Sequence, residues 1–444
     1  MTAEVPHARQ RSITGSWAAI LTLADQVLSS ASNFALGVLI ARVGGAEALG
    51  SFGIAFLIWL AGVGVNRALL TEPMTVGGPT RSGDAQLREG MLASLLVGVA
   101  VAGVLAVAGG GLLLAGIDAV AVLALAPWLP SLLVQDYWRA MGFRLQRPDL
   151  AFVSDVVFVL VQGGVTVALF ALGARNLTAF LAAWGIGALG GALVGQRMAR
   201  TSMLGGGGVS HLRNLWPRSR WFLAEFGTAF TAGQGYLFLV PVLVGTAGFG
   251  IFRAGASLIG PVVTVFLAAG NVALPESARR FREYGPAGLK AYTPRLTAAV
   301  TAVTLLYCGT VAILAGPMVR LVYGAGFDGA VLITQLVAVQ YMLSGVAFGC
   351  GIALKAAGYL KQLWLVRGVG AVVSITGLLV LTRLFGLPGA AYAGIAAAGV
   401  YLVAVMLAYQ RTVAQASPRP AHAAPTARRS AVPGTEGRHR AADR

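Results

Sequence analysis

The feature that most constrains this chain is the repeated occurrence of apolar runs, each long enough to cross a lipid bilayer as a helix. Crossing the hydrocarbon core takes about 20 apolar residues, and every backbone polar group there must be satisfied within the protein. Only 11% of the residues are charged, too few to cover a water-soluble fold. The sequence therefore predicts an all-α polytopic membrane protein with twelve spans, at residues 17–41, 49–70, 90–114, 119–143, 150–173, 176–199, 220–245, 250–275, 295–316, 330–354, 361–384 and 388–410.

The distribution of basic residues predicts how these spans are oriented. If both termini are cytoplasmic, 27 of the 33 Lys and Arg residues fall on the cytoplasmic side, in agreement with the positive-inside rule. The formal charge of +17 then reflects orientation and contact with anionic membrane lipids, so no nucleic-acid partner is predicted. The other six basic residues are Arg67 within a span and, near the outer ends, Arg42, Arg175, Arg253, Arg320 and Arg383.

Composition shifts divide the chain into five parts. Gly205 to Gly208 indicate a flexible joint, and the end of the chain is rich in Ala, Pro and Arg without periodicity, which indicates disorder. We expect a cytoplasmic N-terminus (1–16), a first lobe of six spans (17–200), a cytoplasmic linker (201–219), a second lobe of six spans (220–410) and a disordered cytoplasmic tail (411–444).

The two halves resemble each other, with an offset that begins near 200 residues. Gly50-Ser-Phe corresponds to Gly250-Ile-Phe, and Asn66-Arg-Ala-Leu corresponds to Asn271-Val-Ala-Leu. Because six spans are an even number, both halves enter the membrane from the same side. The repeat axis then lies along the membrane normal, as in transporters that rock two bundles around a central site.

Several chemistries are missing from the sequence. There is no GxxxxGK[ST] motif for phosphate binding, and all four histidines lie outside the spans, which leaves no intramembrane histidine site for a metal. No loop on the outer side exceeds about a dozen residues, whereas an integral membrane glycosyltransferase or ligase usually needs a long one. We therefore predict no catalytic residues, no metal and no cofactor, and keep such an enzyme as the least favoured alternative.

One pair of segments resembles a known family. The first hairpin, Asn33-Phe-Ala-Leu-Gly-Val-Leu-Ile-Ala-Arg42 and onward to Gly50-Ser-Phe52, is similar to the opening of bacterial polysaccharide flippases of the O-antigen and teichoic-acid type. Gly248-Phe-Gly-Ile-Phe-Arg253-Ala resembles the start of their eighth helix. These proteins belong to the multidrug/oligosaccharidyl-lipid/polysaccharide exporter superfamily. The resemblance implies two pseudo-repeated six-helix lobes that form a V-shaped cavity lined largely by helices one, two, seven and eight.

Acidic residues within the spans are costly in lipid and are therefore candidate ion-coupling residues. Asp25 lies in span one, with Ser29, Ser32 and Asn33 on about the same helical face. Glu225 follows 200 positions later, so we expect it to be the pseudo-equivalent residue; alternatively, it pairs with a nearby arginine, Arg218 or Arg220, at the membrane surface. Near the inner ends of spans four and five we expect structural ion pairs, Asp136 with Arg139, and Asp155 with Arg144 or Arg147.

Basic residues at the cavity are candidates for binding an anionic substrate, because the planar guanidinium can bind two phosphate oxygens at once. Arg67 and Arg253 are the main candidates, completed by the polar residues Asn33 and Gln234. The alternative for an arginine near a helix end is that it extends to the lipid headgroups, which we favour for Arg42.

The resemblance implies a flippase that moves an undecaprenyl-type lipid-linked oligosaccharide across the cytoplasmic membrane by alternating access, without enzyme chemistry and with a proton or sodium ion as the coupling ion. A cation-coupled multidrug or metabolite antiporter of the same superfamily is the alternative. The residues leave open the sugar composition, the lipid carrier, the coupling ion and the oligomeric state.

Overall fold

A computed structural model of the protein describes residues 8–76, 84–201 and 206–414, and every element in these ranges is a helix. The predicted tail lies outside the described residues from position 415 onward. The first lobe contains α1 (Ala8–Asn66), the π-helical turn η1 (Arg67–Thr71), α2 (Glu72–Val76), α3 (Asp84–Leu114), α4 (Val120–Leu125), the short 3₁₀ helix η2 (Ala126–Trp128), α5 (Leu129–Arg144), α6 (Pro148–Ala171) and α7 (Leu177–Met198).

The second lobe has the same kind of construction. Its elements are α8 (Gly208–Gly233), the 3₁₀ turn η3 (Gly235–Leu239), α9 (Val240–Ile259), α10 (Pro261–Ile313), α11 (Ala315–Tyr323), α12 (Gly329–Ala356), α13 (Leu360–Phe385), α14 (Leu387–Tyr409) and the π-helical turn η4 (Gln410–Ala414).

Glycines fold the longest helices back on themselves. Gly45 in α1, Gly245 in α9 and Gly285 in α10 have positive φ angles and non-helical backbone, so the chain reverses direction at each of them. Ten helical segments are long and apolar enough to cross a membrane, and three of these, Ile20–Thr75, Gly235–Ile259 and Pro261–Ile313, contain such a reversal. With α8, η3 and the start of α9 as the seventh pass, the chain makes the twelve predicted passes. The predicted fold class is confirmed.

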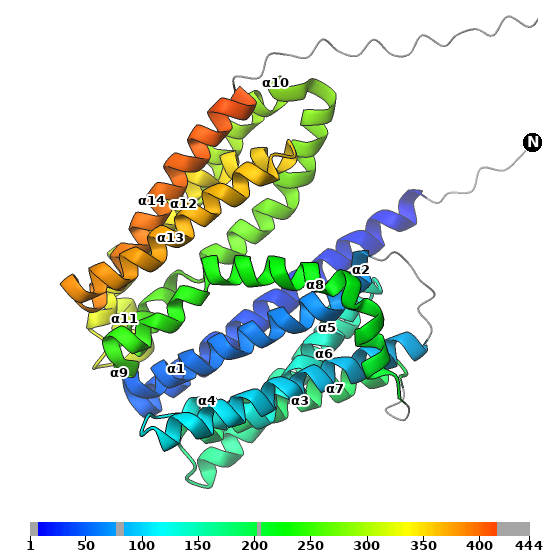
Figure 1. Cartoon of the computed structure of the whole chain (residues 1–444), viewed down its shortest axis with the longest axis vertical. Helices are drawn as coiled ribbons and strands as arrows, with labels where there is room; N and C mark the ends of the chain where they lie inside the picture. Colours follow the sequence, from blue (N-terminus) through cyan, green and yellow to red (C-terminus); the bar gives the residue numbers. More distant parts are fainter. Residues whose placement is uncertain (1–7, 77–83, 202–205, 415–444) are drawn as a thin grey trace, which may run out of the picture.

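The two lobes meet at one end and diverge toward the other, which forms a V (Figure 1). We call the end where they meet, near Gly45, Gly245 and α11, the closed end. The opposite end, where α1 begins and α14 finishes, is the open end. The main contact between the lobes joins α1 to α9.

The contact at the closed end follows the internal repeat. A Cβ atom added to Gly50 would overlap the carbonyl oxygen of Thr246, and one added to Gly250 would overlap that of Ala46. The two contacts are equivalent, because adding 200 to the residue numbers 50 and 46 gives 250 and 246. The pseudo-two-fold axis therefore passes between Gly50 and Gly250. At this point, equivalent residues of the two lobes are therefore separated by the 200 positions that the sequence predicts.

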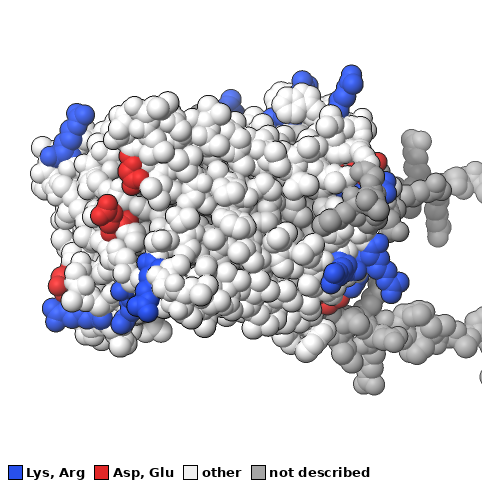
Figure 2. Space-filling view, turned by 90° about the horizontal axis from the view of Figure 1, so that it is seen from below, with Lys and Arg blue, Asp and Glu red and all other residues white. Residues whose placement is uncertain are grey.

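The outer surface of the helices is apolar. On the face drawn in Figure 2, Lys, Arg, Asp and Glu gather toward the ends and along one edge, and a broad central area is uncharged. Large apolar side chains are solvent-accessible on many helices, among them Val107 on α3, Leu160 on α6 and Leu306 on α10. A continuous exposed apolar surface of this kind is stable in hydrocarbon and unstable in water.

Helix α8 connects the lobes and packs against both. It begins at Gly208 within the segment expected to be a linker, contacts α3, η1 and α2 of the first lobe, and also contacts α13 of the second. Ser219 donates a hydrogen bond of 2.6 Å to the carbonyl oxygen of Leu69 in η1, and His211 is buried near Glu89 of α3. From Gly208 onward, the segment expected to be a linker is therefore a helix anchored to the first lobe.

Candidate functional site

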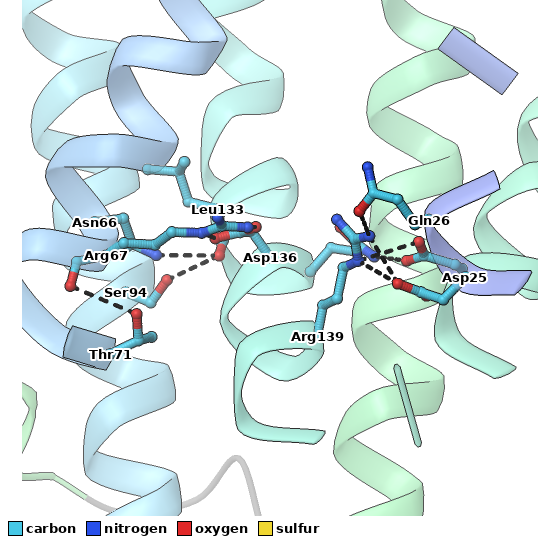
Figure 3. A network of polar contacts seen from close by, with 11 residues as sticks. Asp25, Gln26, Asn66, Arg67, Thr71, Ser94, Leu133, Asp136 and Arg139 are labelled. Atoms are coloured by element: carbon cyan, nitrogen blue, oxygen red, sulfur yellow. Dashed lines mark hydrogen bonds and ion pairs between the residues drawn. The ribbon is translucent and has the colours of Figure 1, made fainter. Parts of the chain in front are cut away.

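A buried ion-pair network joins three helices of the first lobe around Arg139 of α5 (Figure 3). Asp25 of α1 is 1% exposed, and its Oδ2 accepts hydrogen bonds from Arg139 Nε at 3.0 Å and Nη2 at 2.7 Å. Arg139 Nε also lies 3.3 Å from Asp155 Oδ2 of α6, whose Oδ1 accepts a hydrogen bond from Gln135. Two carboxylates thus share one guanidinium, and Asp25 Oδ1 is buried without a hydrogen-bond partner in the described part of the chain.

The second network holds Arg67 against α5. Arg67 opens the π-helical turn η1, and its Nε and Nη2 donate to the two carboxylate oxygens of Asp136 at 2.9 and 2.5 Å. Asn66 and Ser94 both donate to the carbonyl oxygen of Leu133 one turn away on α5 (Figure 3). Single π-helical turns are often found at functional sites. The side chain of Arg67 is 42% exposed, so it is neutralised by Asp136 while remaining accessible.

The ion pairs differ from those expected from the sequence. Asp136 pairs with Arg67 and Arg139 pairs with Asp25 and Asp155, so the expected pairs Asp136–Arg139 and Asp155 with Arg144 or Arg147 are wrong. The two residues of α5 share a helical face at spacing three, but each side chain bonds to a neighbouring helix. Helix packing, which short sequence spacing does not reveal, determines these partners.

Arg253 of α9 has a different environment. Its guanidinium lies over the rings of Phe56 and Phe52, at 4.4 and 5.3 Å from their centroids, and forms no ion pair with any described carboxylate. These rings belong to α1 beyond Gly45, so the contact joins the two lobes. Gly53 makes the approach possible, because a Cβ there would lie 2.9 Å from Arg253 Cδ. The cation thus lies between the lobes against the aromatic rings of Phe52 and Phe56.

The aromatic rings beside Arg253 form a cluster that sequence analysis did not identify. Trp59 lies 5.1 Å from both Phe56 and Trp184, measured between ring centroids. Trp59 Nε1 is buried and has no acceptor among the described residues. The apolar runs of spans two and six contain these positions, but an apolar run does not reveal which of its aromatic side chains meet in the folded protein. The indole of Trp59, whose N–H has no acceptor among the described residues, and the guanidinium of Arg253 both lie against the ring of Phe56.

The remaining predicted residues lie apart from these networks. Asn33 is half-buried on α1, and Gln234 is exposed at the end of α8; neither side chain forms a hydrogen bond with another described residue. Glu225 is exposed on α8 and forms no ion pair within the described ranges, but it lies close enough to Glu72 for the two carboxylates to repel. Asp25 and Glu225, although 200 positions apart, therefore occupy different surroundings.

Metal binding has no support among the described residues, because no group of three or more His, Cys, Asp or Glu side chains there is placed to hold an ion.

Comparison with known proteins identifies the fold. No protein-family model matches the chain, and no curated protein matches it. Among solved structures, an inward-facing multidrug resistance MATE transporter of the MOP superfamily is similar with a TM-score of 0.69, 13% identity, and coverage of 88% of this chain and 94% of that one. The lipid II flippase MurJ in an inward closed conformation gives 0.66 and 13%, covering 89% and 87%. A eukaryotic MATE transporter gives 0.59 and 14%, covering 89% and 95%. The chain has the transporter fold that MATE proteins and MurJ share.

Proposed function

We propose that this protein is a flippase that moves an undecaprenyl-type lipid-linked oligosaccharide across the cytoplasmic membrane by alternating access. Its fold is that of known transporters, among them the lipid II flippase MurJ. The open end of the V faces the cytoplasm in this proposal, because that orientation places most Lys and Arg residues inside. The headgroup enters between the lobes while the lipid tail stays in the bilayer.

The charge pattern inside the spans is the observation on which this proposal rests. Asp25, Asp136 and Asp155 are each bound by an arginine, whereas Arg253 has no carboxylate partner among the described residues. A cation that is shielded from water and lacks a counter-ion favours an anionic ligand. The pyrophosphate of a lipid-linked sugar supplies such a group, and a cationic drug does not.

The hydrogen-bonding groups near Arg253 extend the proposed substrate site. Trp59 Nε1, which is buried and has no acceptor among the described residues, is proposed as a second donor for a phosphate oxygen or a sugar hydroxyl. Arg67 is proposed to contact the substrate nearer the open end, where its guanidinium is partly exposed beside Asp136. Asn33 and Gln234 have uncommitted amide groups and are kept as polar contacts along the path.

An antiporter for cationic molecules is the alternative, and one observation favours it. Glu72 and Glu225 are exposed, lie close enough to repel each other, and are not ion-paired with any described residue. Two such carboxylates attract a cationic cargo. The two functions therefore predict different essential residues, Arg253 for the flippase and Glu72 with Glu225 for the antiporter.

Substitution of Arg253 distinguishes the two. Arg253→Ala should abolish export of surface polysaccharide at unchanged protein abundance, and Arg253→Lys should restore only part of it, because a lysine lacks the two-donor fork. Arg67→Ala should also impair export. Arg383→Ala, at an exposed arginine of the second lobe, is the matched control and should leave export normal. Normal export by Arg253→Ala together with altered dye efflux would favour the antiporter.

For energy coupling we propose Asp25, with Glu225 as a weaker contributor. Moving one charge through 100 mV is worth about 2.3 kcal/mol, enough to bias a transport cycle. Asp25 shares Arg139 with Asp155 and has one buried oxygen free of hydrogen bonds, which a proton or sodium ion can occupy. Asp25→Asn should remove the dependence of transport in proteoliposomes on the imposed gradient. Full gradient-dependent activity in that variant would exclude Asp25 as the coupling residue.

A further inference from the structure

Arg42 forms hydrogen bonds between the two lobes at the closed end. It lies on α1, three residues before the reversal at Gly45, and its guanidinium reaches α11 of the second lobe. Arg42 Nε donates to the carbonyl oxygen of Val322 at 2.8 Å, and Nη2 donates to that of Leu321. The sequence favoured an arginine extending to lipid headgroups, but these two hydrogen bonds direct it to protein.

The two acceptors are unusual because they are among the last four carbonyls of a helix, α11, which ends at Tyr323. The last four carbonyl groups of an α-helix have no partner within it, and the helix dipole places partial negative charge there. The N–H of Gly324 donates to the carbonyl oxygen of Arg320, the residue before Leu321. The carbonyls of Leu321 and Val322 are thus left to accept from Arg42. A cation with two parallel donors matches this position in both charge and geometry.

The contact has no counterpart in the other half of the repeat. Val242 lies 200 positions after Arg42, is 79% exposed, and offers no side-chain hydrogen bond. The nearest acidic residue along the chain from α11, Asp328, is paired with Arg320 at 3.3 Å and does not compete for Arg42. The closed end therefore combines a symmetric glycine contact with one asymmetric polar contact.

We propose that Arg42 is a latch that holds the closed end together and must release α11 before the lobes can separate there. It is a positioning residue for alternating access and touches no cargo, so the inference goes beyond the proposed function and holds for a flippase or an antiporter. Arg42 is exposed at the end of the molecule, so water can hydrate both partners after separation. The latch is therefore reversible.

The test measures the distance between the lobes at the closed end in the full-length protein. Spin labels are placed at Ile117→Cys, beside the α3–α4 turn, and at Phe385→Cys, at the end of α13; both side chains are exposed and lie on different lobes. Cys308 and Cys350, which are buried, are replaced by Ala to give a single labelled pair. Double electron–electron resonance in liposomes then measures the distance between the two spin labels, which is short when the closed end is intact and longer when the lobes have separated there.

We expect Arg42→Gln to increase the long-distance population about tenfold, and Arg42→Lys, which keeps the charge without the fork, to give an intermediate increase. Arg175→Gln is the control, because Arg175 lies near the same end but its guanidinium rests over Phe170 of its own lobe. A distance distribution of Arg42→Gln equal to that of the unsubstituted protein would overturn the proposal. So would an equal change in Arg175→Gln, which would indicate a general effect of charge. Equal melting temperatures of the variants confirm that all are folded.

Discussion

Gly50 of α1 and Gly250 of α9 lie against each other across the lobe contact, and each fits against a backbone carbonyl on the other lobe, Thr246 for Gly50 and Ala46 for Gly250. Neither position has space for a methyl group. The close approach of the two lobes therefore depends on a glycine at the equivalent position of each repeat. Small residues generally allow helices in membranes to pack this closely.

Substitution of either glycine should open the closed end. In Gly50→Ala or Gly250→Ala the added Cβ overlaps a carbonyl oxygen of the opposite backbone, which only separation of the lobes can relieve. Inter-lobe distances from spin labels at the closed end should therefore lengthen. Gly110→Ala on α3 is the control, since a Cβ there meets nothing within 4 Å and should leave the distances unchanged. Unaltered distances in Gly50→Ala would show that the contact tolerates a side chain.

The shared arginine of the first lobe predicts unequal costs for its partners. Arg139→Gln leaves Asp25 and Asp155 buried without a counter-ion, and the loss of one partner of a buried ion pair costs about 3–5 kcal/mol. Asp25→Asn leaves Arg139 paired with Asp155 and should cost about 1 kcal/mol. Chemical unfolding in detergent measures both variants. Equal destabilisation by the two would contradict the sharing of one guanidinium by two carboxylates.

The docking of α8 should weaken in acid. Burial lowers the pKa of His211 below its ordinary value, and the nearby Glu89 only partly opposes this shift. The folded protein then binds fewer protons at His211 than the unfolded chain, so stability falls as the pH drops below about 6.5. We expect the melting temperature to decrease between pH 7.5 and 5.5, and His211→Gln to reduce this decrease.

A companion substitution tests the sign of that argument. Because Glu89 raises the pKa of His211, Glu89→Gln should lower it further and enlarge the loss of stability in acid. Arg144 also lowers the pKa of His211, so Arg144→Gln should have the opposite effect. A melting temperature whose pH dependence is the same in His211→Gln and the unsubstituted protein would exclude His211 as the group responsible.

Reporter fusions test the orientation of the molecule. The distribution of Lys and Arg predicts that fusions at Gly116, Arg175 and Gly386 report the outside, whereas fusions at Gly206 and after Arg411 report the cytoplasm. Gly116 and Gly386 lie in turns toward the closed end, so this experiment also determines which side of the membrane that end faces. A cytoplasmic signal at Arg175 would contradict the proposed orientation.

The spans and their repeat could be predicted from the sequence because lipid imposes strong local constraints. Each span needs a run of apolar residues, and a reversal such as that at Gly45 needs a residue that tolerates positive φ; both are visible within a few neighbouring positions. The correspondence of Gly50 with Gly250 was also visible, because a repeat is a property of the sequence itself.

The partners of the charged residues could not be predicted in the same way. Asp25 and Arg139 are 114 positions apart, and their contact depends on which helices are neighbours and how each is rotated. The spacing of Asp136 and Arg139 along one helix suggested that they pair with each other. However, side chains on a helical face can also bond to the helices packed against that face, as both of these do. For the same reason, the carbonyls that bind Arg42 belong to a short helix, α11, most of which lies beyond the end of the predicted span 295–316.

The position of the buried ion pairs has a mechanical consequence. Within the described spans, all of these ion pairs belong to the first lobe, where they connect α1, η1, α5 and α6. Their hydrogen bonds are directional and fix the relative positions of these helices. The spans of the second lobe are held mainly by apolar contacts, which keep most of their energy when helices slide or rotate slightly. We expect the first lobe to behave as the stiff member of the pair, and most of the bending during a cycle to occur in the second.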